Sequence, residues 1–279
     1  MSPIVMHVLA AAIYTALGFH LWRTRWRTAS VNSLATPQHG LRPWERVALL
    51  AALVAHAMTI RFALFDGIHL HFGFALALSV MVWLAIALYW IESLYARLDG
   101  LLMIGLPVAT ITSLLPGLFV DPHLLTNIDS PAFRLHLLMA MLAYSFFTLA
   151  ALHALLMAAT ERSLHQGRLS PLLAGLPPLL TMESILFRLI HIAFVLLSIT
   201  LISGIFFSEH LFGQALRFDH KTFFAILSWL IFAALLIGRH VYGWRGRLAL
   251  RWTLTGFITL LLAYVGSRFV LEVILNRGA

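Results

Sequence analysis

Residues that could bind an iron-containing macrocycle are concentrated in one stretch, Ser208–Lys221, between two apolar runs. Imidazoles there can ligate iron, cations can pair with carboxylates, and flat apolar rings can pack on a porphyrin. The imidazoles are His210 and His220, the cations are Arg217 and Lys221, and the rings include Phe212 and Phe218. Together these residue types indicate a porphyrin site.

Two histidines lie close to predicted helix N-termini. Ser130, followed by a proline, is typical of a helix start and places His136 in the second turn of the fifth apolar run. Asp219 is the predicted N-cap of the seventh run, with His220 in its first turn. A helix N-terminus disfavours imidazolium and leaves a neutral ring able to ligate iron. The alternative for both is an interfacial histidine bonded to water or a backbone carbonyl.

Other histidines lie deeper or toward the opposite side. His56 is in the middle of the second apolar run, where a histidine faces the bundle interior or a cavity. It is therefore a functional candidate, and an interhelical hydrogen bond is the equal alternative. His153, His191 and His240 fall near helix ends, where we expect water to reach them. Glu92 is expected to pair with Arg97.

The composition is that of an integral membrane protein. Of 279 residues, 61% are apolar and 11% charged, whereas soluble domains carry about 25% charged residues. The formal charge of +8 comes from arginines in loops between apolar runs, which is an orientation signal rather than a nucleic-acid site. The absence of cysteine excludes thiol chemistry, disulfides and haem attached covalently to this chain.

About eight apolar runs are long enough to cross the hydrocarbon core, and in lipid they must be helices. They are Ile4–Trp22, Val47–Phe65, Phe72–Ile91, Leu101–Val120, Leu135–Ala159, Ile185–Phe207, Thr222–Gly238 and Trp252–Leu275. We therefore expect an all-α polytopic membrane protein. The longest connections, Arg23–Trp44 and Thr160–Glu183, are too short for a second domain, so residues 1–279 should form one transmembrane domain.

Arginine counts predict the orientation. Arginines are abundant after the first, fifth and seventh runs, for example Arg25, Arg162 and Arg247, and the loop after the third run carries Arg97. The alternate loops hold far fewer. By the positive-inside rule, both termini and the Ser208–Lys221 loop should lie on the outer, periplasmic side.

Several motifs of the second half resemble the cytochrome c assembly (CcsA/CcmC/ResC-like) membrane family, and within it the YpjD/HemX-like inner-membrane subgroup. They are the Gly-aromatic step in Ile202–Phe206, the loop Phe212–Lys221, Trp229 in the next run, the turn Gly243–Arg247, His136 with Tyr144, and Tyr264–Arg268. The resemblance covers about residues 130–275.

This resemblance implies haem b held at the outer face between two histidines and a tryptophan-rich loop, for attachment to apocytochrome c. Here Phe212, Leu216 and Phe218 stand where the family has tryptophan, and His220 stands where it has proline. The second outer histidine of the family has no counterpart after His240. Ligation of haem to apocytochrome is not expected from this chain alone, so we predict no enzyme.

The leading hypothesis is a haem-binding inner-membrane protein that presents haem at its outer face. His136 and His220 would be the axial ligands, with Arg134, Arg217 and Lys221 pairing with propionates. The further candidates are Phe212, Phe218, Asp219, His56 and His240. Expected partners are membrane lipid and cytochrome c maturation or haem-biosynthesis proteins. The alternative is a haem-free membrane scaffold or regulator acting through partner proteins, and a small-molecule transporter is less favoured.

Overall fold

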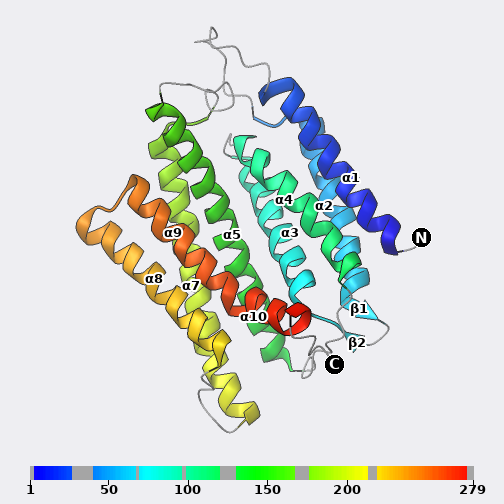
Figure 1. The fold of residues 1–279 in the computed structure, drawn as a ribbon, viewed down its shortest axis with the longest axis vertical. Coiled ribbons are helices and arrows are strands. Elements are labelled where there is room, and N and C mark those ends of the chain that lie inside the picture. The colour runs from blue at the N-terminus through cyan, green and yellow to red at the C-terminus, as the bar shows by residue number, and fades with distance from the viewer. Residues whose placement is uncertain are drawn as a thin grey trace.

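The protein is a bundle of antiparallel helices. The computed structural model describes residues 3–26, 40–66, 69–95, 99–119, 130–166, 176–212 and 219–274. The long helices are α1 (Pro3–Leu21), α2 (Pro43–Leu64), α3 (Phe74–Glu92), α4 (Leu102–Leu118), α5 (Pro131–His165), α7 (Leu179–Phe212), α8 (His220–Tyr242) and α9 (Gly246–Leu261). Successive helices alternate in direction (Figure 1).

Short elements complete the described part of the chain. A two-stranded antiparallel sheet, β1 (Phe65–Asp66) and β2 (His69–Leu70), follows α2. The remaining short helices are η1 (Trp22–Trp26), η2 (Asp99–Leu101), η3 (Leu262–Gly266), α10 (Ser267–Phe269) and η4 (Val270–Ile274). The elements η3, α10 and η4 continue α9 toward the C-terminus.

The apolar helices match the dimensions of a membrane. Within the described residues, seven helices are long and apolar enough to cross a bilayer. The helix α4 is apolar but has only 17 residues and contains Pro107 and Pro116. The helical, polytopic architecture predicted from the sequence is therefore confirmed, whereas the count of eight spans stays a prediction.

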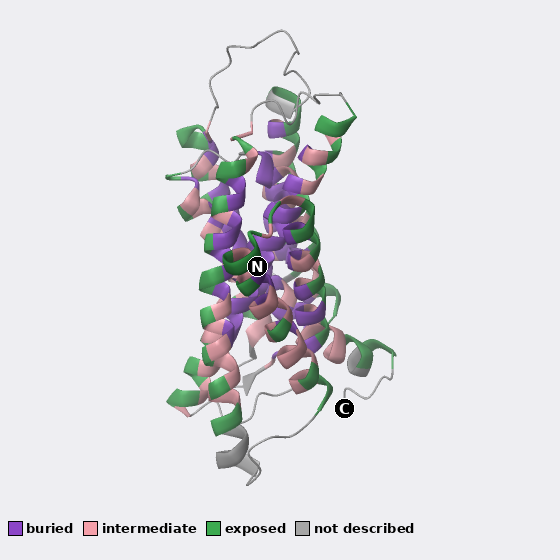
Figure 2. Cartoon of the chain, turned by 90° about the vertical axis from the view of Figure 1, so that its left-hand side faces the viewer, coloured by how far each residue is buried: buried purple, intermediate pink, exposed green. Residues whose placement is uncertain are grey.

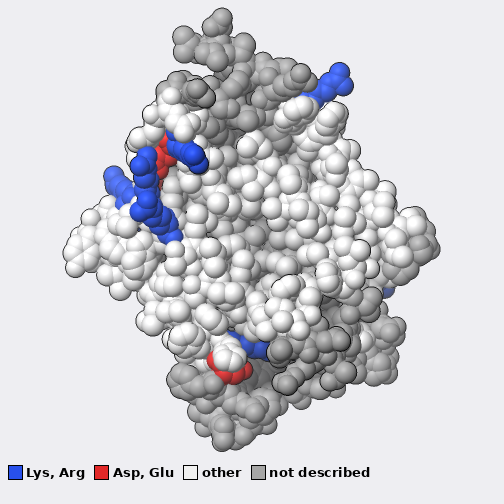
Figure 3. Space-filling view, in the orientation of Figure 1, with Lys and Arg blue, Asp and Glu red and all other residues white. Residues whose placement is uncertain are grey.

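Apolar side chains cover the outside of the bundle as well as its inside. Val54, Ile111, Val195 and Leu230 are each more than half exposed near the middle of their helices. Figure 3 shows a broad band on one face without Lys, Arg, Asp or Glu. A contiguous apolar surface of this size would be costly in water and is favourable in lipid. The outward faces of the helices are therefore adapted to a bilayer.

Buried residues gather along the centre of the bundle, and exposed ones lie at helix ends and outer faces (Figure 2). The helix α5 contacts α3, α4, α7 and α9 and is the central element. Phe147 of α5 stacks on Phe232 of α8, with the ring centroids 3.9 Å apart. A Cβ atom at Gly256 of α9 would lie 2.8 Å from the Phe232 ring. The missing side chain at this glycine therefore lets α8 and α9 pack closely.

The helices extend beyond the predicted apolar runs, and this corrects three boundaries. The helix α7 continues to Phe212, so the first part of the predicted Ser208–Lys221 loop is helical. The predicted connection Thr160–Glu183 shortens to residues 166–178, because α5 runs to His165 and α7 begins after Pro177–Pro178. The last run begins at Gly246 rather than Trp252. Hydropathy marks only the hydrocarbon-embedded part of a helix, whereas backbone hydrogen bonding continues into the interface.

Candidate functional site

The start of α5 positions His136. The Ser130 hydroxyl accepts a hydrogen bond from the Phe133 N–H at 3.4 Å, which confirms the predicted N-cap. His136 follows in the second turn and is partly buried. Its Nδ1 lies 2.8 Å from the hydroxyl oxygen of Ser203 on α7. The ring is therefore oriented by a neighbouring helix and is not simply a solvated side chain.

The hydrogen bonds of Ser203 define the tautomer of His136. The Ser203 hydroxyl also lies 3.0 Å from the Thr200 carbonyl oxygen, which can only accept. A serine hydroxyl has one proton, so both contacts form together only when Ser203 donates to Thr200 and accepts from the Nδ1–H of His136. The other ring nitrogen, Nε2, then carries the lone pair. This is the arrangement found for metal-ligating histidines.

The step Ser203–Gly204 forms the wall against which the imidazole lies. A Cβ atom at Gly204 would lie 3.5 Å from Cε1 of His136, an ordinary contact distance, so the ring lies directly against this part of α7. Sequence reasoning recognised this step as a motif but missed its partner. The signal available was an adjacent serine and glycine within a predominantly apolar helix.

The start of α8 carries the second candidate histidine. Asp219 is the N-cap, as predicted, and its carboxylate accepts from the Thr222 N–H at 2.9 Å and from the Thr222 hydroxyl at 2.8 Å. Burial raises the pKa of the Asp219 carboxyl, but these hydrogen bonds and the Lys221 charge lower it more, so the net pKa is below its ordinary value of 3.8. His220 is the first residue of α8 and is exposed. Because α5 and α8 begin at the same end of the bundle (Figure 1), His136 and His220 lie at that end.

Lys221 lies over an aromatic ring. Its ammonium nitrogen is 5.7 Å from the centroid of the Tyr264 ring, and the Tyr264 hydroxyl donates to the Phe72 carbonyl at 3.3 Å. Arg134 is exposed on the first turn of α5. Both cations therefore lie at the end of the bundle that holds His136.

Part of the predicted site lies outside the described residues. Arg217 and Phe218 belong to the stretch 213–218, and Phe212 contributes only its backbone position as the last residue of α7. The convergence of these residues with His136 and His220 on one porphyrin therefore stays a prediction.

His56 is held by hydroxyl groups on two other helices. Its Nδ1 lies 3.3 Å from the Tyr14 hydroxyl of α1, and its Nε2 lies 2.8 Å from the Ser79 hydroxyl of α3. The ring is fully buried. Both ring nitrogens therefore have partners, which is the geometry of the interhelical hydrogen bond that the sequence left as an alternative.

Among the histidines that the sequence placed near helix ends within reach of water, His153 differs from the prediction. His153 is fully buried, with Nε2 3.4 Å from a Glu92 carboxylate oxygen, so the expectation that water reaches this ring was wrong. The reason is that α5 lies at the centre of the bundle and α3 covers this face. Arg97, the expected partner of Glu92, lies outside the described residues. His240 is exposed in the last turn of α8, about 30 Å along the helix from His220.

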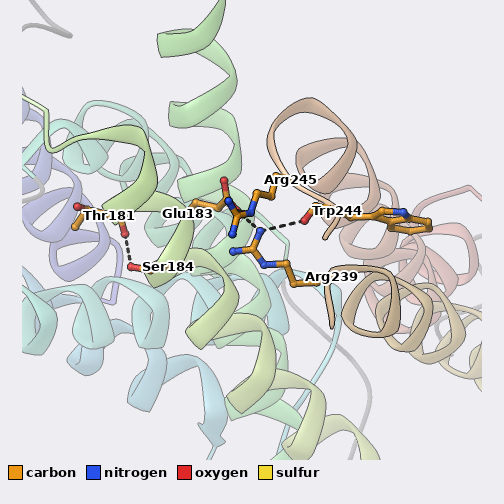
Figure 4. A network of polar contacts seen from close by, with 6 residues as sticks. All are labelled: Thr181, Glu183, Ser184, Arg239, Trp244 and Arg245. Carbon is orange, nitrogen blue, oxygen red and sulfur yellow. Dashed lines mark hydrogen bonds and ion pairs between the residues drawn. The ribbon is translucent and has the colours of Figure 1, made fainter. Parts of the chain in front are cut away.

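The turn Gly243–Arg247 is built by backbone geometry and an ion-pair network (Figure 4). Gly243 ends α8 in the left-handed region, with φ of 67°, where a residue without Cβ is favoured. The N–H of Trp244 then donates to the Gly238 carbonyl at 3.1 Å. The guanidinium of Arg239 donates to the Trp244 carbonyl at 3.2 Å and to the Glu183 carboxylate of α7.

This network ties three helices together. Arg245 lies 3.9 Å from the Glu183 carboxylate that Arg239 contacts, and the Trp244 ring packs on the Trp252 ring of α9 at 5.2 Å. The conspicuous glycine, tryptophan and arginine residues of this turn therefore hold the α8–α9 hairpin against the start of α7. It lies at the opposite end of the bundle from His136, so it is a structural motif rather than part of the candidate site.

A bundle of apolar helices, apolar on its outer faces and with arginines gathered at helix ends, defines a polytopic membrane protein. Residues 44–275 match the model of the cytochrome C assembly protein family. The chain therefore belongs to this family, as its motifs suggested.

Individual relatives match this chain over different lengths. The inner membrane protein YpjD of Escherichia coli (strain K12) is 28% identical over 243 residues, covering 83% of this chain and 89% of the relative. An uncharacterized 28.8 kDa protein of Azospirillum brasilense is 31% identical over 161 residues, covering 58% and 55%. The cytochrome c biogenesis protein CcsA of Prochlorococcus marinus (strain MIT 9301) is 37% identical over 89 residues, covering 32% and 29%. The similarity to CcsA is therefore confined to about a third of each chain.

Proposed function

We propose that this chain is a multi-pass protein of the bacterial inner membrane that binds haem b and presents it at the periplasmic face during cytochrome c biogenesis. Membership of the cytochrome c assembly family and the names of its relatives support the membrane location and the pathway. The observation that carries the haem assignment is the Thr200–Ser203–His136 hydrogen-bond chain, because it gives His136 a ligand tautomer.

The residue types of the candidate site are those that haem binding uses. His136 and His220 would ligate the iron, and Arg134, Arg217 and Lys221 would pair with the propionates. Phe212 and Phe218 would pack on the macrocycle. When bound, haem b supplies the iron centre that imidazoles ligate and is itself the group handed to a client. The role of this chain is to hold and orient that group, so no catalytic residue is proposed.

The orientation belongs to the same proposal. The helices α1, α5 and α8 finish at one end of the bundle, and the starts of α5 and α8 lie at the other (Figure 1). In the sequence, arginine-rich stretches follow α1, α5 and α8. By the positive-inside rule the His136 end faces the periplasm. The whole chain would then form one transmembrane domain of eight spans, α4 included, with both termini outside. Partners would be maturation proteins that meet the periplasmic end.

The absorption spectrum of the detergent-purified protein tests the haem assignment. We expect a Soret band that His136→Ala removes or shifts. His191→Ala is the matched control, because His191 is exposed and its Nδ1 lies 2.7 Å from the Phe187 carbonyl oxygen of its own helix. A haem-free wild-type preparation that does not take up added hemin would contradict the proposal.

A second candidate function is a haem-free scaffold or regulator acting through partner proteins. The observation that favours it is the replacement of the family's loop tryptophans by Phe212, Leu216 and Phe218. Under this function a co-purifying partner would remain bound to the His136→Ala variant, and the wild type would show no Soret band.

A further inference from the structure

A groove of about 410 Å³ lies between the end of α5 and the start of α9. Its charged and apolar walls include Arg162 and His165 of α5 and Arg247, Leu250, Arg251 and Leu254 of α9. Figure 3 shows basic side chains gathered around acidic atoms over this part of the molecule. This end is opposite to the candidate haem site, so the groove belongs to a separate function.

Both walls follow helical periodicity. On α9, positions 247, 250, 251 and 254 lie on one face, and on α5 positions 158, 161, 162 and 165 do the same. The outermost lining residues are His165 and Arg247, and the innermost, Ala158 and Leu254, are apolar and lie about 10 Å farther along their helices. Arg162 and Arg251 lie between them, about one turn from the apolar inner residues. The groove therefore grades from a cationic mouth to an apolar floor.

The mouth carries an excess of positive charge. The Nε of Arg247 donates to a Glu161 carboxylate oxygen at 2.7 Å, so this pair is neutral. Arg162 and Arg251 are exposed, and within the described part of the chain neither has a carboxylate partner. Two guanidinium groups are therefore available, and guanidinium matches phosphate oxygens with paired donors.

We propose that this groove binds an anionic phospholipid, with Arg162 and Arg251 on the headgroup phosphate and an acyl chain along Leu250 and Leu254. A free phosphate ion would use the mouth but leave the apolar floor exposed. A phospholipid matches both, because its charged headgroup is joined directly to an apolar chain, as the cationic and apolar parts of the groove adjoin each other. The orientation proposed above places this end of the bundle at the cytoplasmic side, where basic pockets between helices are typical lipid-headgroup sites.

Native mass spectrometry and thermal unfolding of the delipidated full chain test this site. We expect phosphatidylglycerol to remain bound and to raise the Tm, and phosphatidylcholine to do neither. Each arginine should contribute about fivefold in affinity, so Arg162→Gln combined with Arg251→Gln should weaken phosphatidylglycerol binding roughly 20- to 30-fold. Circular dichroism would confirm that this double variant keeps its helices.

The matched control removes the same charge from the same end of the bundle. Arg23 is exposed in η1, just after α1, and Arg42 is exposed just before α2. The combination of Arg23→Gln and Arg42→Gln should therefore retain phosphatidylglycerol. Equal binding of the two lipids, or equal losses in both double variants, would overturn the proposal. Stabilisation by inorganic phosphate as large as that by phosphatidylglycerol would overturn it too, because the apolar floor would then play no part.

Discussion

At the scale of single residues, Ser203 is the side chain that makes His136 chemically distinct. Many serine and threonine hydroxyls in these helices donate only to a carbonyl of their own helix, as Ser184 does to Thr181. Ser203 does this and in addition accepts from the imidazole of His136. Removing its hydroxyl would free the ring to rotate and to change tautomer.

We expect Ser203→Ala to lower the affinity for hemin by about 10- to 100-fold, the usual effect of losing the partner of a metal-ligating histidine. Titration of the apoprotein with hemin, followed in the Soret region, measures this. Ser184→Ala on the same helix should leave the affinity unchanged. If His136→Ala abolishes binding but Ser203→Ala does not alter it, the hydrogen bond has no orienting role.

Asp219 makes the start of α8 sensitive to acid. Its folded-state pKa is lowered below 3.8, so folding favours the carboxylate, and its stabilisation is present above 3.8 and lost as pH falls through the folded-state pKa. At pH 7, Asp219→Ala should cost about 0.5–2 kcal/mol. This difference from wild type should shrink in thermal unfolding near pH 3. Asp219→Asn, whose cap does not titrate, should show no such trend.

At the scale of elements, the α8–α9 hairpin depends on one close approach. A Cβ atom at Gly238 would lie 2.4 Å from the Trp244 ring, a distance that requires the indole to move. The Trp244 indole also packs on Trp252, and the backbone carbonyl of Trp244 accepts a hydrogen bond from Arg239. The indole therefore cannot shift without loosening the hairpin. The glycine is therefore part of the same motif as Gly243 and Trp244.

We expect Gly238→Ala to destabilise the protein by about 1–3 kcal/mol, as overpacking does elsewhere. Thermal unfolding in detergent measures this. Gly18→Ala is the control, since its Cβ would meet Leu106 at an ordinary 3.7 Å, and in a helix it should be neutral or slightly stabilising. In a Trp244→Ala background the cost of Gly238→Ala should disappear. A cost that persists there would rule out the indole as its cause.

At the scale of the whole molecule, the arrangement combines an apolar exterior with chemically different ends. The arginine-rich end holds the Glu183 network and the groove between α5 and α9, and the other end holds His136 and His220 (Figure 1). Because successive helices alternate in direction, the starts of α5 and α8 gather at one end of the bundle and the starts of α7 and α9 at the other. The orientation in the membrane therefore decides which compartment each end meets.

The lack of native cysteine makes this orientation directly measurable. Ala132→Cys and Gln166→Cys place thiols at exposed positions at the two ends of α5. A membrane-impermeant maleimide applied to cells with a permeable outer membrane should label position 132, and position 166 only after the inner membrane is disrupted. The cysteine-free wild type should stay unlabelled. The reverse pattern would contradict a periplasmic haem site.

Much of the architecture and the local part of the site were predictable. The membrane-spanning helices follow from long apolar runs, because an unpaired backbone is too costly in lipid. The caps at Ser130 and Asp219 follow from residue types within one turn. The ion-pair network of Gly243–Arg247 was not predictable, because its carboxylate, Glu183, comes from a helix distant in sequence.

By itself the sequence determined that the long apolar runs are helical and where helices α5 and α8 begin, since these depend on hydropathy and on contacts within a few residues. Only the tertiary structure decided that Ser203 orients His136, that His153 is buried, and that α5 and α9 form a cationic groove. Each of these depends on which faces of two helices meet. That choice is made by packing across the bundle, where small residues such as Gly238 and Gly256 allow close approach, and hydropathy carries no information about it.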